Sequence, residues 1–491
     1  MINEAQITIR NAGFILGQRG ILILGSLVLA LLVPRIMGPD TYGRYVLVTS
    51  LSLWFLVFTD LGSLQVMGRY VPPLILQGEK AKLQKFFGRF LVVDSLTGAI
   101  CGCLYLLFTR VWLTDFNLLL LIVPAITVLA RASAQPFYNL FLGLNQAGRW
   151  GMAEIFRQWF LIVLVISGFY IGGLQGALLG VFLTEVAVLS IGVWWGRPYC
   201  SMAEMRLDIR YLIPYLRFGF IFFISHLFAS ALLNSGVVLI RFFYTDYAQV
   251  SYFGLANSIH LGISFAIPQF ALAFAPLLVT LQAQGETKAL RQWIEHLISW
   301  LTIGGFFVVF GVLLLGNDLV PLVLGAAYQP VATNLLPLSV ALCLQVLSSV
   351  AFILTLVYNR PWEAAMASGI RLIAFWCLGP LLVARWGSLG GCFAFLGAST
   401  FHAGYLTWRM QGVSGYSLKK FGRLIAMGLL FVPLAWLRSS WPVNIILYGI
   451  FVTGYCTLLF LLRFITTSEV VTVWRAIGKR GRFSNPELRE K

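Results

Sequence analysis

Two loops, PRIMGPD at residues 34–40 and IRFFYTD at residues 240–246, are the part of the sequence that decides the fold. Each joins two apolar stretches, each has an Asp five residues after an Arg, and each leads to a Tyr, Tyr45 or Tyr252, that opens the next stretch. Six apolar stretches separate the loops, so both have the same orientation across a membrane. Parallel repeats of this kind predict two six-helix bundles related by a pseudo-two-fold axis, with a site between them.

The composition excludes a soluble globular fold, since 59% of the 491 residues are hydrophobic, 11% are charged and the mean hydropathy is +0.86. A helix needs about 20 apolar residues to cross a bilayer. We predict fourteen such spans, at 12–33, 45–68, 86–109, 117–142, 151–172, 175–195, 218–240, 251–278, 297–316, 333–357, 364–384, 389–408, 423–437 and 442–463.

The expected fold class is therefore an all-α polytopic membrane protein of about 14 transmembrane helices. The repeat divides it into two six-helix bundles and two extra C-terminal helices. The predicted boundaries are 1–196 for the first bundle, 197–217 for a cytoplasmic linker, 218–408 for the second bundle, 409–463 for helices 13 and 14, and 464–491 for a basic cytoplasmic tail.

The net charge of +17 is explained by topology rather than by nucleic-acid binding. Assigned to alternate sides of the spans, most Lys and Arg fall on the side of the amino terminus, in the loops 69–89, 197–217 and 409–423 and in the tail. The positive-inside rule then predicts that both termini are cytoplasmic. The seven cysteines show no paired spacing, and the sequence has no phosphate-binding glycine loop, so we expect no metal, cofactor or ATPase site.

The first loop, with its flanking residues, and two further motifs add a resemblance. The run LVPRIMGPDTYGRY at 32–45 resembles the first loop of Wzx-type polysaccharide flippases, which belong to the multidrug/oligosaccharidyl-lipid/polysaccharide exporter (MOP) superfamily. Gly62 followed by GRYVP at 68–72 is similar to the end of their second helix, and LGAAY at 324–328 is similar to their Phe-Gly-x-x-Tyr loop. The order and spacing of the three motifs carry the resemblance, which runs over the whole chain.

The resemblance implies a flippase of the bacterial inner membrane. Its substrate would be a lipid-linked oligosaccharide, typically on undecaprenyl pyrophosphate, moved from the cytoplasmic to the periplasmic leaflet by alternating access for O-antigen, capsule or exopolysaccharide export. Membrane lipids, a polysaccharide polymerase and glycosyltransferases are the candidate partners. A cation-coupled multidrug or small-solute antiporter and a membrane glycosyltransferase or ligase are the alternatives. No loop is long enough for a catalytic domain, so we expect no enzyme.

Ionisable residues inside the first six spans are the first candidates for a site. Such residues are costly in lipid and mark pathways, partners or ligands. We assign Arg19 and Arg131 to substrate binding, because guanidinium groups suit pyrophosphate. Desolvated carboxylates suit a coupling proton, so Asp60, Asp94 and Glu185 are the candidates for ion coupling. Structural pairing within the bundle, such as Arg19 with Asp94 or Glu154 with Arg157, is the alternative.

Polar stripes supply the remaining candidates. Gln135 and Tyr138 share one helix face with Arg131, at spacings of four and seven. Asn234, Asn257 and His260 form stripes in the second bundle, and Arg371 stands alone in the eleventh span. Amides, hydroxyls and imidazoles favour sugar contacts over metal ligands, so these residues are candidates for binding the oligosaccharide. Hydrogen bonds between helices are the alternative for all of them.

Overall fold

The structure is a computed structural model that describes residues 21–462, apart from residue 23, and residue 464. Nearly all of these residues are helical and no β-strand occurs among them. Ten of the described segments are long and apolar enough to cross a membrane. The predicted all-α polytopic fold is confirmed. The candidate residue Arg19 lies outside the described residues.

The first bundle consists of an apolar helix over Leu24–Met37 and five further elements: α2 (Pro39–Val57), α3 (Ser63–Leu76), α4 (Lys80–Trp112), α5 (Leu118–Gly143) and α6 (Ala147–Gly196). The long element α6 is a hairpin, because Gly172 and Gly173 leave the helical conformation and Gly173 has φ +57°. A side chain on Gly176 would lie 1.9 Å from the Gly168 carbonyl oxygen, so the two arms pack backbone against backbone. They correspond to the predicted spans 151–172 and 175–195.

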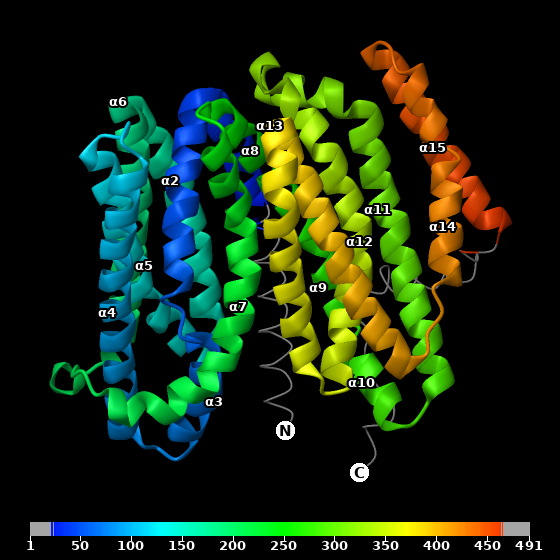
Figure 1. The fold of residues 1–491 in the computed structure, drawn as a ribbon. Helices are drawn as coiled ribbons and strands as arrows, with labels where there is room; N and C mark the ends of the chain where they lie inside the picture. The colour runs from blue at the N-terminus through cyan, green and yellow to red at the C-terminus, as the bar shows by residue number, and fades with distance from the viewer. Residues whose placement is uncertain (1–20, 23, 463, 465–491) are drawn as a thin grey trace.

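The second bundle consists of α7 (Ile209–Phe243), α8 (Tyr247–Ser264), α9 (Ala266–Ala273), α10 (Ala275–Ala283), α11 (Thr287–Leu324), α12 (Gln329–Val357) and α13 (Pro361–Ser414). α13 is also a hairpin, and its arms reverse at Gly387, which has φ +56°. α14 (Lys419–Leu429), η4 (Val432–Leu437) and α15 (Trp441–Leu461) follow and pack against α11 (Figure 1). Short 3₁₀ turns η1 (Arg197–Tyr199), η2 (Met202–Glu204) and η3 (Ala326–Tyr328) complete the chain.

The eighth predicted span is broken into α8, α9 and α10. Pro268 lies four residues after Ser264, and a proline has no N–H to donate to the carbonyl one turn earlier. Gln345 of α12 supplies the missing donor, because its side-chain nitrogen lies 3.4 Å from the Ser264 carbonyl oxygen. The break between α8 and α9 is thus stabilised from a neighbouring helix, as buried backbone groups in a membrane require.

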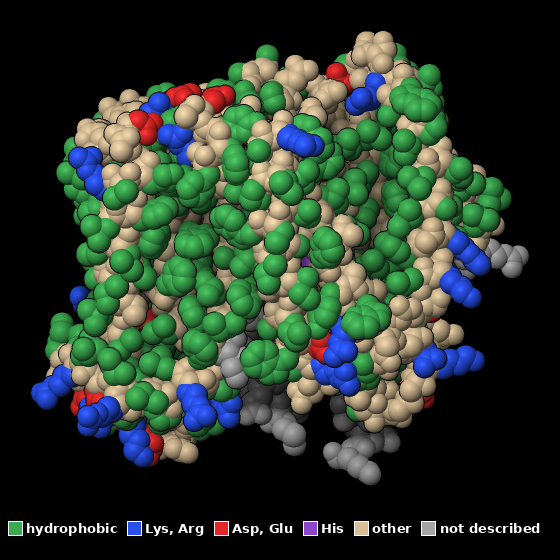
Figure 2. Space-filling view, in the orientation of Figure 1, with side chains coloured by type: hydrophobic (Ala, Val, Ile, Leu, Met, Phe, Trp, Pro, Cys, Tyr) green, Lys and Arg blue, Asp and Glu red, His purple; other side chains and the backbone are tan. Residues whose placement is uncertain are grey.

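The two ends of the molecule differ in charge. One end, which is lower in Figure 1, carries the turns 77–79, 144–146, 284–286 and 358–360 and the segment 197–208. Figure 2 shows many Lys and Arg side chains along this edge. We call it the basic end, and it corresponds to the side that the sequence predicts to be cytoplasmic.

The hydrophobic cores show where the two bundles are joined. At the end opposite the basic end, one cluster contains residues of both bundles, among them Leu47 and Tyr105 of the first and Phe253 and Tyr328 of the second. Toward the basic end the bundles have separate clusters, around Phe86, Phe90 and Phe141 in the first and around Ile294, Leu354 and Leu406 in the second. The bundles therefore share a core at the opposite end, whereas each keeps a core of its own toward the basic end.

The amino-terminal half of α7 packs against the first bundle, although its remainder packs in the second. Leu212 and Tyr215 belong to the same hydrophobic cluster as Phe86 of α4. Burial raises the pKa of Tyr211 to about 12, so its hydroxyl keeps its proton at neutral pH. The Arg89 guanidinium of α4 lies over this neutral ring, 4.6 Å from its centre. α7 thus contacts both bundles. The predicted start of the second bundle at residue 218 stays a prediction.

Asp208 fixes the start of α7, and its loss is expected to destabilise the protein. Its carboxylate accepts a hydrogen bond from the Tyr211 backbone N–H at 3.1 Å and forms an ion pair with Arg89 of α4. Because N-cap substitutions by alanine cost about 1–2 kcal/mol, we expect Asp208→Ala to lower the free energy of unfolding by that amount. Denaturation of the purified protein in mixed micelles measures it. Glu204→Ala, whose carboxylate lies 3.9 Å from Arg89, is the matched control with a smaller expected loss.

Candidate functional site

A cavity of about 320 Å³ lies inside the first bundle, between α2, α5 and the two arms of α6. Its wall combines two guanidinium groups, two carboxylates and several hydroxyl and amide groups with apolar side chains. The lining residues are Tyr45, Thr49, Ser52, Leu53, Leu56, Thr127, Val128, Arg131, Glu154, Arg157, Gln158, Leu161, Val181 and Glu185. Such a polar wall within membrane-spanning helices is the mark of a functional site.

The charged groups of this cavity form one connected network. Glu185, on the second arm of α6, lies between two arginines, with its Oε1 3.5 Å from Nη1 of Arg131 and its Oε2 3.3 Å from Nε of Arg157. Nη1 of Arg157 donates to Oε1 of Glu154 at 2.6 Å. The cavity thus contains two positive and two negative charges. Burial of these four groups costs desolvation free energy, and their ion pairs with one another offset that cost.

The two arginines differ in their exposure. The Arg157 side chain is 14% exposed and the Glu185 side chain is 3% exposed, whereas the Arg131 side chain is 34% exposed. Arg157 also has a second carboxylate partner and the ring of Tyr138 at 5.3 Å. Arg131, with its single long ion pair, is therefore the guanidinium group that can exchange Glu185 for an anionic ligand at the lowest cost.

Of the predicted polar stripe Arg131, Gln135 and Tyr138 on α5, one residue lines this cavity. Arg131 lines it, but Gln135, one turn further along, does not. Tyr138 is buried and its hydroxyl donates to the Val188 carbonyl oxygen of α6. This hydrogen bond joins two helices, which agrees with the structural alternative for Tyr138.

The three predicted ion-coupling carboxylates lie apart. Only Glu185 lines the cavity. Asp60 lies between α2 and α3, where it accepts a hydrogen bond from the Ser63 N–H at 3.2 Å and has His226 of α7 at 3.9 Å. Asp94 of α4 is 2% exposed, and its Oδ1 has no hydrogen-bond partner among the described residues. Within that same part of the chain, no group of three His, Cys, Asp or Glu could hold a metal ion.

The predicted polar residues of the second bundle make contacts within that bundle. The side-chain nitrogens of Asn234 and Asn257 donate to the carbonyl oxygens of Ser230 and Leu233, at 3.1 and 3.3 Å. The His260 ring packs edge-on against the Phe395 ring, with 5.3 Å between the ring centres. The Arg371 guanidinium lies over the same Phe395 ring, 4.7 Å from its centre.

Arg371 is the exception among these residues, because it carries a charge without a carboxylate in ion-pair distance in the described chain. Its Nη2 donates to the Ser399 hydroxyl at 2.9 Å, across the two arms of α13. Its Nε has no hydrogen-bond partner among the described atoms. Arg371 lies in the other bundle from the charged cavity, and its role in substrate binding stays a prediction.

Several residues of the cavity were not singled out from the sequence. Gln158 and Leu161 follow Glu154 at spacings of four and seven, so they share its helix face, and this pattern could have placed them in the site. Thr49, Ser52 and Thr127 had no such signal. Their hydroxyls bond to backbone carbonyls within their own helices, which is common for Ser and Thr anywhere in a membrane helix.

The repeated loops meet at the end opposite the basic end and join the two bundles. Arg35 of the first loop donates to the Val323 carbonyl oxygen at the end of α11, at 3.2 Å. Arg241 of the second loop lies 3.6 Å from Asp115, after the end of α4. α4 and α11 are each the third span of their bundle, so the exchange is reciprocal. The pseudo-symmetry inferred from the loops therefore extends to their contacts.

Two tyrosines strengthen this junction. The Tyr247 hydroxyl donates to Asp115 at 2.5 Å, and the Tyr328 hydroxyl donates to the Pro34 carbonyl oxygen at 2.7 Å. We call the five residues Arg35, Asp115, Arg241, Tyr247 and Tyr328 the inter-bundle clasp. It holds together the end of the molecule at which the bundles share a core.

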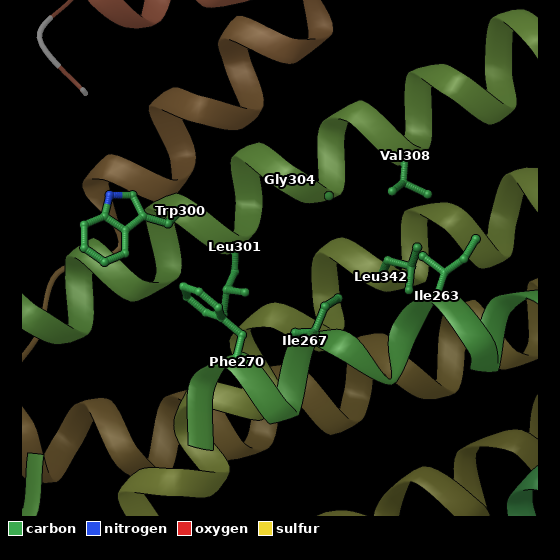
Figure 3. A pocket seen from close by; sticks show the side chains of 9 residues that line it. Ile263, Ile267, Phe270, Trp300, Leu301, Gly304, Val308 and Leu342 are labelled. Atoms are coloured by element: carbon green, nitrogen blue, oxygen red, sulfur yellow. The ribbon is translucent and has the colours of Figure 1, made fainter. Parts of the chain in front are cut away.

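A second cavity, of about 340 Å³, lies between α8, α9, α11 and α12 (Figure 3). Its wall contains only apolar side chains and two glycines, with Ile263, Ile267 and Phe270 on one side and Leu301 and Val308 on the other. Such a wall suits hydrocarbon and has no charged side chain, and the Trp300 indole is its one side chain with a polar group. The charged cavity of the first bundle is therefore the candidate site for a polar ligand.

The helical two-bundle fold with its membrane-spanning segments defines a polytopic membrane protein. Residues 9–282 match a family model described as polysaccharide biosynthesis protein, and the chain belongs to this family. The resemblance noted from the loops is thereby confirmed. No curated protein matches the chain.

Solved structures with the same fold come from two kinds of transporter. The lipid II flippase MurJ, in an inward closed conformation, has a TM-score of 0.65 and 13% identity, over 92% of this chain and 100% of that one. A multidrug resistance MATE family transporter of the MOP superfamily, in an inward-facing conformation, has a TM-score of 0.58 and 16% identity, over 81% and 93%. The Vibrio cholerae MATE transporter VcmN, in a bent form, has a TM-score of 0.53 and 13% identity, over 83% and 98%. At these identities the likeness concerns the fold.

Proposed function

We propose that the protein is a flippase for a lipid-linked oligosaccharide. It moves the substrate, carried on undecaprenyl pyrophosphate, from the cytoplasmic to the periplasmic leaflet of the bacterial inner membrane during synthesis of a cell-surface polysaccharide such as O-antigen or exopolysaccharide. Both termini lie in the cytoplasm. The observation that carries the proposal is a charged, hydroxyl-lined cavity within the membrane-spanning helices of a chain from a polysaccharide biosynthesis family.

The cavity chemistry supports a pyrophosphate head group as ligand. Guanidinium groups bind phosphate oxygens through paired donors. Arg131 is the accessible guanidinium, and Thr49, Ser52 and Gln158 surround it with neutral hydrogen-bonding groups. In this proposal the substrate displaces Glu185 from Arg131, while Arg157 retains Glu185 and keeps the carboxylate paired.

The junction between the bundles supports alternating access. With the clasp formed and the shared core intact, the protein is closed at the end opposite the basic end. Passage of a head group to that side requires these contacts to break. Arg35 and Arg241 make reciprocal contacts, so separation of the bundles at this end breaks one loop contact on each side together with the shared core.

Arg131→Ala is expected to lower the translocation rate by at least tenfold, the effect of losing one charge-assisted interaction of about 1.4 kcal/mol. The measurement uses proteoliposomes loaded with a lipid-linked oligosaccharide, whose exposed sugar is oxidised from outside. Arg131→Lys, which keeps the charge but lacks the fork geometry, should retain an intermediate rate.

Arg149→Ala is the matched control for this experiment. Arg149 lies at the basic end of α6, where its Nη1 bonds to the Gln146 side chain, and it does not line the cavity. If the wild-type protein translocated the lipid-linked oligosaccharide no faster than protein-free liposomes do, the proposed flippase function would be contradicted. Equal rates for wild type and Arg131→Ala would remove Arg131 from the site.

The MATE-type fold makes a drug or small-solute antiporter the second candidate function. Expression in a drug-sensitised strain tests it, because an antiporter would restore growth and the flippase would not. Imposed proton or sodium gradients in the same proteoliposomes test coupling through Asp60, Asp94 or Glu185. Incubation of the purified protein with labelled lipid-linked sugar tests for glycosyl transfer.

A further inference from the structure

A third cavity, of about 510 Å³, lies in the second bundle at the end opposite the basic end. It is open to the surface and is lined by the first turn of α8, the last turns of α11, the start of α12 and the reversal of α13. Its size is within the roughly 300–1,000 Å³ of small-molecule sites. The charged cavity lies in the first bundle, so the two cavities are separate, and the proposed function does not involve the cavity of the second bundle.

The wall of this cavity has no charged side chain and combines amide and hydroxyl groups with apolar surface. Its hydrogen-bonding groups come from four elements: Gln249, Asn317, Gln329, Asn334 and Ser388, with the exposed ring of Trp386 beside them. Pyrophosphate would require arginine or lysine, and a metal ion would require carboxylates, neither of which lines this cavity. Amides and hydroxyls next to an aromatic face match the hydroxyls and the apolar C–H face of a neutral sugar.

The local backbone is built to present these groups. Gly387 has φ +56°, and a side chain on it would lie 2.7 Å from Oε1 of Gln249. The close approach allows the Ser388 N–H to donate to that oxygen at 3.1 Å, which holds the Gln249 amide in one orientation. Trp386 and Ser388 on either side of the glycine are thereby placed at the cavity.

Asn334 independently indicates a ligand. Its side chain is buried, with the residue 1% exposed, yet its amide nitrogen has no hydrogen-bond partner among the described atoms. A buried amide donor without a partner costs about 1–3 kcal/mol. A turn of the Asn334 side chain toward the cavity that it lines would let this donor bond to a sugar hydroxyl and would remove the cost.

We propose that this cavity binds a neutral sugar unit at the end of the protein opposite the basic end. Its ligand class follows from the wall chemistry, and the identification of that sugar as part of the translocated oligosaccharide rests on the proposed function. The cavity then holds the glycan of the substrate on the periplasmic side, apart from the head-group cavity of the first bundle. Two sites of different chemistry would thus serve the two parts of one ligand.

Trp386→Ala tests the site. The probe is the mixture of neutral oligosaccharides that mild acid releases from the polyprenyl-linked pool of the source cells. Saturation-transfer NMR with the full chain in nanodiscs measures binding. We expect the wild type to saturate the sugar resonances and Trp386→Ala to bind at least about tenfold more weakly, the loss expected for one stacking contact. Gln329→Ala, which is exposed and removes one amide, should also weaken binding.

Trp362→Ala is the matched control, because Trp362 is also exposed but lies at the basic end, in the first turn of α13. Undiminished binding by Trp386→Ala, or an equal loss in Trp362→Ala, would overturn the site. Absence of sugar binding in a wild type that still translocates lipid-linked oligosaccharide would overturn the inference and leave the proposed function standing. Sugar binding without translocation would support the cavity and contradict the flippase.

Discussion

Glu185→Gln is expected to lower the free energy of unfolding by about 3 kcal/mol, the largest effect on stability of any single substitution proposed for this protein. Breaking a buried ion pair from one side costs about 3–5 kcal/mol, because the remaining charge keeps its desolvation penalty. Glu185 is 3% exposed and faces both Arg131 and Arg157. Its loss leaves two positive charges with only Glu154. Denaturation in mixed micelles measures the change.

A double substitution tests whether the lost stability comes from the unpaired charge. Arg131→Gln combined with Glu185→Gln removes one charge of each sign and leaves Arg157 paired with Glu154, so part of the lost stability should return. Glu154→Gln is the matched control, since Glu154 is 29% exposed and Arg157 keeps Glu185. A Glu185→Gln protein as stable as the wild type would show that the ionic network does not hold the bundle together.

Gly43→Leu is expected to block closure of the end opposite the basic end and to abolish translocation. Gly43 lies where α2 meets α8, and a side-chain Cβ on it would lie 1.9 Å from the Tyr247 carbonyl oxygen. The obstacle is backbone, so it cannot rotate aside. Overpacking of this kind costs about 1–3 kcal/mol, which shifts an equilibrium between two states by roughly fivefold to 150-fold.

Electron paramagnetic resonance distances test the shift. Spin labels at positions 110 and 385, both exposed and on opposite bundles, should move apart in Gly43→Leu in a background with the native cysteines replaced. Gly254→Ala should have a smaller effect, because its Cβ would meet the Val46 side chain, which can move. Gly68→Ala meets nothing within 4 Å and is the neutral control. An unchanged label distance in Gly43→Leu would contradict the close packing of α2 and α8.

The spans and the bundle repeat could be predicted because both follow from local rules. Hydropathy over about 20 residues identifies a membrane helix regardless of its neighbours. Gly172 with Gly173, and Gly387, reverse the chain where the predicted spans end, since glycine adopts positive φ without strain. The break in the eighth span also has a local cause, because the missing N–H of Pro268 acts on its own helix.

The partners of the charged residues could not be predicted in this way. Glu154 with Arg157 was visible as a pair at a spacing of three on one helix. The pairing of Glu185 with Arg131 and Arg157 was not, because it joins α5 and both arms of α6. Likewise Arg35 and Arg241 were recognised as a repeat, yet their contacts with Val323 and Asp115 join loops of opposite bundles.

The sequence by itself determined that the chain crosses a membrane many times, where most turns lie, and that its two halves repeat. These properties depend on hydropathy, length and backbone conformation, which are encoded within about one helix. The tertiary structure decided which ionisable groups share a cavity, which tyrosines close the junction between bundles, and which amides gather around Trp386. Those relations depend on the rotation and crossing of neighbouring helices, and packing of the whole chain sets both.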